Sequence, residues 1–134
     1  MRDRPSRVDG TLSKRILVVD DEIEIVDLLR DILTSEGFEV DAAATAESAL
    51  EFIKANIYDG ALLDFNLPDM DGVMLHHRIR QMDEELARHC IFMSGLVQSD
   101  SNLGYYSSQS GGFLSKPFDI RDVLSAVRGI LEVA

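Results

Sequence analysis

The stretch LDFNLPDMDG, residues 63–72, marks the end of one strand and the start of the next helix. An apolar run, Ala61 to Leu63, leads directly into the carboxylate of Asp64. Asn, Pro, Asp and Gly follow it, and each of these residues favours turns for its own backbone reason. We therefore expect Asp64 at the carboxyl end of a buried strand, where open α/β sheets bind their ligands.

Three more apolar runs also end in polar side chains. They are Ile16 to Val19 followed by Asp20-Asp21, Cys90 to Met93 followed by Ser94, and Phe113-Leu114 followed by Lys116. Because the carboxyl ends of parallel strands meet at one edge of a sheet, we expect these side chains and Asp64 to form a single site.

The rest of the chain alternates strands with amphipathic helices. Five strands are expected. The third ends at Asp64, and the others are Arg15 to Val19, Phe38 to Ala43, Cys90 to Ser94 and Phe113-Leu114. The expected core-facing positions are Ile25, Leu28, Leu29 and Ile32 in the first helix, Ala46, Ala49, Leu50 and Ile53 in the second, Leu75, Ile79 and Met82 in the third, and Ile120, Val123, Leu124, Val127 and Leu131 in the last. Continuous apolar strands between such helices predict an α/β fold with a parallel sheet covered on both faces.

Polar residues mark the expected helix boundaries. The first helix should stop near Gly37, Thr45 is suited to cap the second, and Asp119 can cap the last with Asp122 three residues on. Asp69 and Asp71 are expected to shape the turn after Asp64 and to cap the third helix. In contrast, the Ser-rich stretch Ser99 to Ser110 has no sustained apolar face, so a helix there would be marginal.

Length and charge limit the classes of protein. At 134 residues the chain fits one domain, and no run approaches the ~18 apolar residues of a membrane span. Its first fifteen residues hold five basic and two acidic residues, a net charge of +3, so the remaining residues carry −14 and the whole chain −11. Such an acidic body argues against direct binding to nucleic acid. We expect a disordered leader at 1–13, one domain at 14–134 with no output domain, and a cytoplasmic location, because residues 1–15 are not a secretory signal.

The converging carboxylates Asp20, Asp21 and Asp64 predict a metal site. Two carboxylates about 4 Å apart repel by roughly 4 kcal/mol at an effective dielectric of 20, which a hard divalent cation relieves. Mg²⁺ suits these oxygen ligands, Mn²⁺ can substitute for it, and the Cys and His ligands typical of zinc are missing from the motif. A lysine and a hydroxyl beside the metal also suit phosphoryl transfer to an aspartate, because they compensate charge on the phosphoryl oxygens.

Taken in order, these residues resemble the receiver domain of two-component response regulators, over about Lys14 to Val133. Asp20-Asp21 is similar to the family's metal-binding pair, and Asp64 to its phosphoacceptor. Ser94 in Met-Ser-Gly and Phe113 are similar to the switch hydroxyl and switch aromatic, and Lys116 in Lys-Pro-Phe to the invariant lysine. The separations, 43 from Asp21 to Asp64, then 30 to Ser94 and 22 to Lys116, also resemble the family's.

The resemblance implies a flavodoxin-like, doubly wound five-stranded sheet of order 2-1-3-4-5, an order for which a receiver protein is a known example. It also implies that the backbone carbonyl of Asn66 is a further Mg²⁺ ligand and that the Lys116-Pro117 bond is cis. The phosphodonor would be a histidine kinase or a histidine phosphotransfer protein. A downstream protein, or a second copy in a homodimer, would bind the face formed by residues 99–110, the fifth strand and the last helix.

The sequence departs from the family pattern in four places. They are Gly95 where alanine is commoner, Leu96 at the next position, Gly111-Gly112 where Gly-Ala is usual, and the Ser-rich stretch. The first three leave the chemistry intact but make the phosphoryl lifetime hard to predict, since Asn66 and Leu96 flank the path of attacking water. The polar stretch puts the usual dimerisation surface in doubt.

Other readings of the chain use similar residues. The chain could be a phosphorelay intermediate, the receiver part of a hybrid histidine kinase, or a scaffold that no longer takes phosphate. An aspartyl-phosphate phosphatase of the haloacid dehalogenase type uses comparable Asp, Mg²⁺, Lys and Ser chemistry. Its nucleophile follows the first strand, whereas here the acidic pair comes first and the acceptor after the third strand. We therefore expect no independent substrate turnover.

The remaining histidines and the single cysteine are assigned structural roles. His76, His77 and His89 have no metal-like or triad partner in the sequence, and Cys90 lies in an apolar run. We expect surface or packing roles for the histidines and a buried, unpaired thiol.

Overall fold

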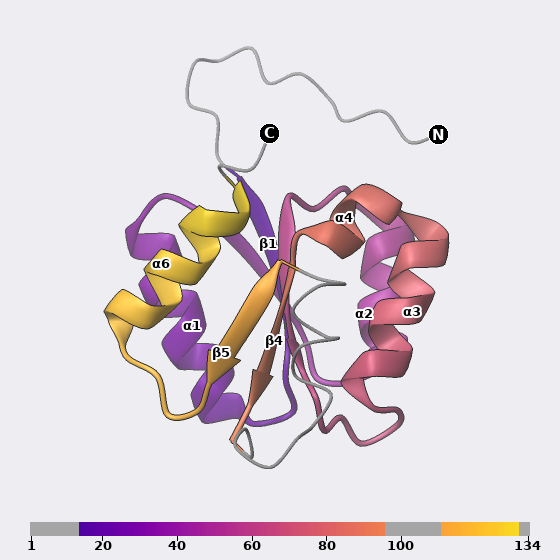
Figure 1. Cartoon of the computed structure of the whole chain (residues 1–134), viewed down its shortest axis with the longest axis horizontal. Coiled ribbons are helices and arrows are strands. Elements are labelled where there is room, and N and C mark those ends of the chain that lie inside the picture. Colours follow the sequence, from indigo (N-terminus) through magenta and orange to yellow (C-terminus); the bar gives the residue numbers. More distant parts are fainter. Residues whose placement is uncertain (1–13, 96–110, 132–134) are drawn as a thin grey trace.

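The computed structural model describes residues 14–95 and 111–131, and within these residues it forms one parallel sheet with helices on both faces (Figure 1). The strand order is β2-β1-β3-β4-β5, which confirms the predicted order 2-1-3-4-5. The strands are β1 (Arg15–Val19), β2 (Glu39–Ala43), β3 (Gly60–Asp64), β4 (Cys90–Ser94) and β5 (Gly112–Ser115). The helices are α1 (Ile23–Ser35), α2 (Ala46–Ala55), α3 (Gly72–Met82), α4 (Glu84–Arg88) and α6 (Ile120–Leu131).

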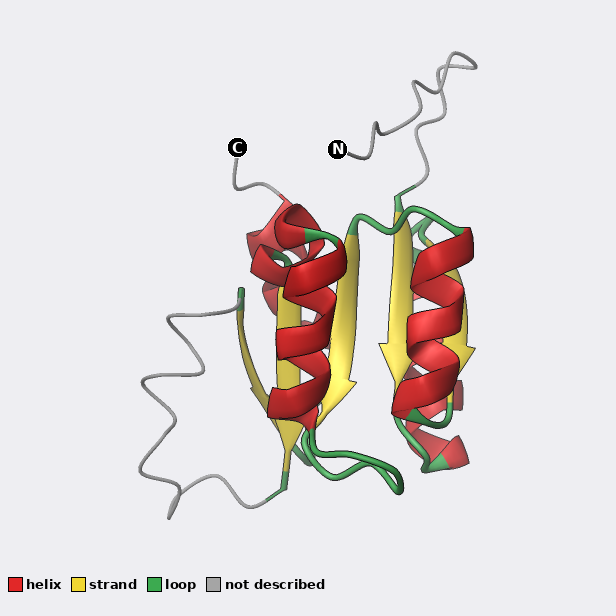
Figure 2. Ribbon diagram, turned by 90° about the vertical axis from the view of Figure 1, so that its right-hand side faces the viewer, coloured by secondary structure: helices red, strands yellow, loops and turns green. Residues whose placement is uncertain are grey.

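The two faces of the sheet bury separate cores, because side chains alternate along each strand. Ile16 and Val18 of β1 pack with α1 and α6, whereas Leu17 and Val19 pack with α2, α3 and α4. Figure 1 shows α1 and α6 on one side of the strands and α2, α3 and α4 on the other, and Figure 2 shows the arrowheads of the strands at one end. The central strand β3 is buried along its whole length. Asp64, its last residue, is therefore held by a rigid and well-packed element.

Most predicted helix boundaries are confirmed by hydrogen bonds that backbone N–H groups donate to carbonyl or side-chain oxygens. Gly37 has φ of 93° and follows α1, and its N–H donates to Thr34 O at 3.0 Å while the next N–H donates to Leu33 O at 3.1 Å. This is a Schellman ending, which favours glycine at the left-handed position. Thr45 caps α2 through the N–H of Ser48. At α6 the carboxylates three residues apart cap each other's N–H groups, as predicted for Asp119 and Asp122.

Three predictions about helices are wrong in detail. The short helix α4 was not predicted, because its five residues contain too few apolar positions to show a period. Leu28 and Ile120, predicted to face the core, are 41% and 59% exposed. Leu33 and Ile130 are buried in their helices instead, because packing against the sheet sets the final rotation of a helix. The predicted marginal helix at 99–110 and the leader at 1–13 lie outside the described residues.

The Lys116-Pro117 peptide bond is cis, as the family resemblance implied. Among the described residues, no helix is long and apolar enough to cross a membrane.

Candidate functional site

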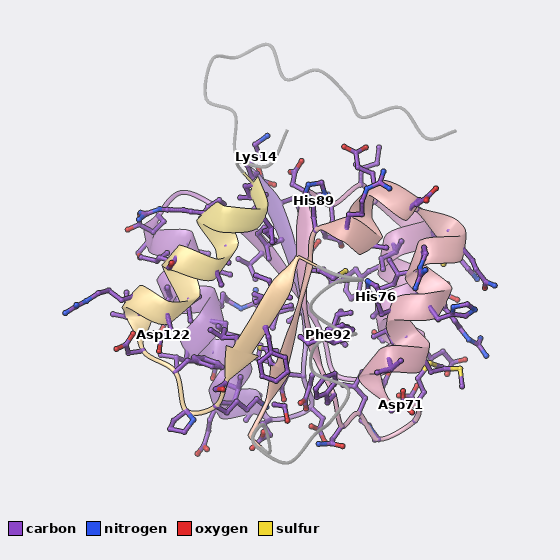
Figure 3. All side chains as sticks on the ribbon, in the orientation of Figure 1. Lys14, Asp71, His76, His89, Phe92 and Asp122 are labelled. Atoms are coloured by element: carbon purple, nitrogen blue, oxygen red, sulfur yellow. The ribbon has the colours of Figure 1, made fainter. Side chains whose placement is uncertain are left out.

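The polar residues predicted to converge lie together at the carboxyl edge of the sheet. Asp20 directly follows β1, Asp64 ends β3, Ser94 ends β4, and Lys116 directly follows β5. The first three are almost fully buried, with 1%, 5% and 3% exposure. Figure 3 shows Asp71, at the start of α3, near this end of the sheet, whereas Lys14 and His89 lie at the opposite end. The parallel arrangement thus brings together residues that are up to 96 positions apart.

Lys116 is the centre of the site, because its ammonium contacts three carboxylates. Its Nζ donates to Asp20 Oδ2 at 2.8 Å and to Glu22 Oε1 at 3.0 Å, and it lies 3.5 Å from Asp64 Oδ1. The Lys116 side chain is only 14% exposed. An ammonium group offers three protons and no acceptor, so this environment suits it well.

The oxygen atoms of Asp20, Asp21 and Asp64 fit a divalent cation. One carboxylate oxygen from each lies within 4.8 Å of the others, with Asp21 exposed and the other two buried. Carboxylate oxygens are the ligands that Mg²⁺ prefers, and an exposed side leaves room for waters or for a phosphate oxygen. Asn66 follows Asp64 by two residues and forms an isolated bridge with Asp71, which keeps its backbone close to β3. The three carboxylates therefore form the predicted acidic cluster.

The ionisation of the site is set by burial and by neighbouring charge. Burial and the negative charge of Asp20 raise the pKa of Asp64, against the opposite effects of Lys116 and of the Asn66 backbone N–H. Burial alone would lower the pKa of Lys116, but its hydrogen bonds to Asp20 and Glu22 outweigh this and raise the pKa to about 12. Lys116 thus stays charged, while Asp64 holds its negative charge at a cost in free energy.

Ser94 and Phe113 lie on the neighbouring strands β4 and β5. Ser94 is opposite Ser115 in the strand register, and its carbonyl accepts the N–H of Lys116 at 2.8 Å. Phe113 is partly buried, and its ring centroid lies 5.6 Å from that of Phe65, the residue after Asp64. The predicted switch aromatic is therefore in contact with the residue that directly follows Asp64.

The loop after Asp64 is anchored by two aspartates with different roles. Asp71 caps α3 as predicted, since its Oδ1 accepts the N–H of Met74 at 2.7 Å. Asp69 does not cap α3. Its two carboxylate oxygens accept the N–H groups of Ala46 and Glu47, each at 2.9 Å, and so cap α2 from a distant loop. The prediction for Asp69 was wrong, because this contact depends on the path of the loop across the molecule.

Replacing Asp69 with alanine is expected to lower the free energy of unfolding at neutral pH, because two N–H groups of α2 lose their acceptor. The same hydrogen bonds lower the pKa of the Asp69 carboxyl. A carboxyl with a lowered folded-state pKa adds stability above its unfolded-state pKa and loses it as pH falls through the folded-state pKa. In urea unfolding, the difference from wild type should therefore shrink in acid. Asp69→Asn, which keeps one acceptor, should be intermediate, and equal stabilities at neutral pH would contradict this cap.

The histidines and the cysteine have packing or surface roles in the described residues. His76 is buried, its Nε2 lies 2.8 Å from Ala87 O, and its ring is in edge contact with Phe92. Burial lowers the pKa of His76, which favours the neutral ring. His77 is exposed, and Nδ1 of His89 lies 2.8 Å from Glu85 O. Cys90 is buried, and burial raises the pKa of its thiol.

One residue of the site was missed by the sequence analysis. Glu22, directly after the acidic pair, is bound to Lys116 across the edge of the sheet. Its position next to Asp20-Asp21 in the sequence could have indicated that it belongs to the site. The contact depends on the direction of a long side chain, which spacing does not predict.

The chain is similar to known proteins over most of its length. The model of the response regulator receiver domain family matches residues 16–128. The transcriptional regulatory protein SrrA of Staphylococcus aureus is 32% identical over 120 residues, which cover 90% of this chain and 48% of that protein. The transcriptional regulatory protein DltR of Streptococcus agalactiae is 30% identical over 114 residues, 85% of this chain and 50% of that protein. The chain therefore spans about half the length of these curated relatives.

Solved structures show the same fold. A response regulator receiver domain protein (CheY-like) from Methanospirillum hungatei JF-1 has a TM-score of 0.82 and 31% identity, covering 90% of this chain and 95% of that chain. The receiver domain of NtrX from Brucella abortus has a TM-score of 0.81 and 31% identity, covering 89% and 99%. These neighbours and this chain form a class of flavodoxin-like α/β domains with a five-stranded parallel sheet. Within that class, the chain belongs to the response regulator receiver domain family.

The family match also bears on the prediction about nucleic acid. The acidic charge of this chain argued against direct binding, but the matched relatives are named transcriptional regulators and are about twice as long. The comparisons therefore do not support the prediction that nucleic acid is not a partner.

Proposed function

We propose that this chain is a phosphorylation-dependent signalling switch in which Asp64 accepts a phosphoryl group from the phosphohistidine of a sensor kinase or phosphotransfer protein. Membership of the receiver family supports this class of reaction. The observation that carries the proposal is a buried carboxylate with an ammonium 3.5 Å away and two further carboxylates within 4.8 Å. Such a group is poised as an acceptor, because its negative charge is only partly compensated in the resting protein.

In the proposed transfer, a carboxylate oxygen of Asp64 bonds to phosphorus as the P–N bond of the donor breaks. The electron pair of that bond returns to the imidazole nitrogen. Lys116 and the Ser94 hydroxyl donate hydrogen bonds to phosphoryl oxygens and compensate their charge. Mg²⁺, held by Asp20, Asp21, Asp64 and the Asn66 carbonyl, would neutralise further charge on those oxygens, and Mn²⁺ suits the same ligands.

The output of the switch would be a change in partner binding. A phosphoryl group on Asp64 draws the Ser94 hydroxyl toward it, which frees space for Phe113 and changes the surface of β5 and α6. A groove of about 420 Å³ between these elements, lined in part by Phe113, Pro117 and Ala126, supports docking of a downstream protein there. A second copy in a homodimer would use the same face. We place this function in the cytoplasm, without turnover of an independent substrate.

Two finer alternatives use the same chemistry. Asp64 could pass its phosphoryl group to a histidine in a relay, or the chain could be the receiver part of a hybrid histidine kinase. The family match favours a receiver over the phosphatase, and the complete set of Asp20, Asp21, Asp64 and Lys116 argues against the scaffold. The family match does not choose among the receiver alternatives.

Incubation with acetyl phosphate and Mg²⁺ is expected to add one phosphoryl group to the intact protein, detected by mass spectrometry. The adduct should not form when excess chelator removes Mg²⁺, because the charge on the phosphoryl group being transferred is then not compensated. Peptide mapping should place the adduct on the segment that contains Asp64.

Two results would contradict the proposal. The absence of an adduct under any condition, with Mg²⁺ binding shown separately, would favour a scaffold that no longer takes phosphate. Sustained hydrolysis of a small phosphomonoester, at many turnovers per molecule of protein, would favour the phosphatase.

A further inference from the structure

The side chain of Glu22 does not cap α1, the helix that follows it. It occupies the N-cap position of α1, where side chains commonly accept an N–H of the first helical turn. Glu22 makes no such hydrogen bond. Its Oε1 instead lies 3.0 Å from Nζ of Lys116, which follows β5 at the other side of the site. The carboxylate therefore acts on the lysine rather than on the helix.

The contact with Glu22 affects where the lysine rests. The ammonium lies 2.8 Å from Asp20 and 3.0 Å from Glu22, and both distances are within the range of N–H···O hydrogen bonds. Its separation from Asp64 is 3.5 Å, at the limit of a hydrogen bond. Asp20 and Glu22 thus hold Nζ closer to the β1–α1 connection than to Asp64, the carboxylate that we propose to react.

The effect of the Glu22 side chain can be tested by a mutation that leaves the carboxylate cluster unchanged. Asp20 is buried and belongs to the carboxylate cluster, so its replacement would alter the metal site and the lysine together. The Glu22 side chain is 62% exposed and is outside that cluster. Its backbone N–H donates to Asp20 Oδ1 at 2.9 Å, a contact that does not require the Glu22 side chain. A change from carboxylate to amide at this position therefore tests the ion pair alone.

We propose that Glu22 is a positioning residue that restrains Lys116 in the resting protein and thereby slows phosphoryl acceptance by Asp64. This inference depends on the proposed function. With acetyl phosphate as donor, an Asp64 oxygen bonds to phosphorus, the P–O bond to the acetyl group breaks, and acetate leaves with its electron pair. In the proposed step, Lys116 moves from Glu22 toward Asp64 to donate a hydrogen bond to a phosphoryl oxygen. Glu22 therefore stabilises the starting state more than the transition state, which lowers the rate.

The test compares initial rates of adduct formation with acetyl phosphate at saturating Mg²⁺. Glu22→Gln is expected to accept the phosphoryl group about two- to fivefold faster than wild type, the range that an exposed ion pair supplies. Glu24→Gln is the matched control. It removes the same charge from an exposed residue in the first turn of α1, and no contact of Glu24 with Lys116 is seen in the described residues.

A second comparison separates positioning from a structural role. In a Lys116→Gln background, measured over longer incubation, Glu22→Gln should give no acceleration beyond that of Glu24→Gln. A helix-capping or folding effect of Glu22 would persist without the lysine, whereas the proposed restraint would not.

Each outcome decides the inference. An unchanged or slower rate for Glu22→Gln, an equal acceleration by Glu24→Gln, or an acceleration that persists without Lys116 would overturn it while leaving the proposed function intact. A wild-type protein that takes no phosphoryl group would overturn both. An acceleration specific to Glu22 and dependent on Lys116 would establish the restraint.

Discussion

Asp64→Asn is expected to abolish the phosphoryl adduct and, in the metal-free protein, to raise the free energy of unfolding. The first effect follows because an amide lacks the nucleophilic carboxylate that we propose bonds to phosphorus. The second follows from the position of Asp64, which is 5% exposed and close to Asp20. Removing a buried and incompletely compensated charge should stabilise the fold by on the order of 1 kcal/mol, as is common where function requires a strained site.

The pH dependence of this stabilisation has a definite sign. Burial and Asp20 raise the folded-state pKa of Asp64 above its unfolded-state value. Below the unfolded-state pKa the carboxyl is neutral in both states and costs nothing. As pH rises from the unfolded-state pKa to the folded-state pKa, the unfolded chain ionises more readily than the folded protein, so the folded protein loses stability. The gain in free energy of unfolding from Asp64→Asn should therefore be smallest in acid. It should grow between the unfolded-state and folded-state pKa values of Asp64 and stay constant at higher pH.

Urea unfolding at several pH values, with chelator present, measures the stability effect, and mass spectrometry measures the adduct. Asp27→Asn is a suitable control, because Asp27 is exposed on α1 and the variant should keep the adduct and a stability close to wild type. An adduct that remains on the Asp64 variant would remove Asp64 as the acceptor. A variant less stable than wild type at neutral pH would mean that Lys116 compensates the Asp64 charge fully.

The convergence of the site could be predicted from sequence because it depends on strand ends alone. Once the apolar runs before Asp20, Asp64, Ser94 and Lys116 are assigned to parallel strands, their carboxyl ends must meet. The bounds of β1 and β4 match the predicted ones for the same reason, since each apolar run has a clear polar end. The strand order itself came from the family resemblance and is confirmed.

Other features depend on tertiary packing that the chain pattern does not contain. Leu28 fits the apolar period of α1 as well as Leu29 does, yet only Leu29 is buried, because the sheet selects one side of a wide apolar stripe. The contacts of Asp69 with α2 and of Glu22 with Lys116 join segments whose approach depends on loop path and side-chain direction. α4 is predictable in hindsight only from its cap, Asp83, whose Oδ1 accepts the N–H of Leu86.

Gly72→Ala is expected to destabilise the protein by about 1–3 kcal/mol and to slow phosphorylation by about tenfold or more. Gly72 begins α3 and is buried against the end of β3, and its N–H donates to Phe65 O at 2.8 Å. A Cβ atom there would lie 2.6 Å from Asp64 O and 2.9 Å from Phe65 Cα. Both neighbours are backbone atoms, so relief requires that the end of β3 or the start of α3 move.

This movement would displace the acceptor itself, which is why both effects are expected from one methyl group. Gly129→Ala is the matched control: Gly129 is exposed on α6, and a Cβ atom there would meet nothing within 4 Å. It should stabilise the protein by roughly 0.5–1 kcal/mol, since alanine is the better helix former. Urea unfolding and the acetyl phosphate assay measure both variants. If Gly72→Ala matched the control in stability and kept the wild-type rate, the close approach of α3 to β3 would not be needed to position Asp64.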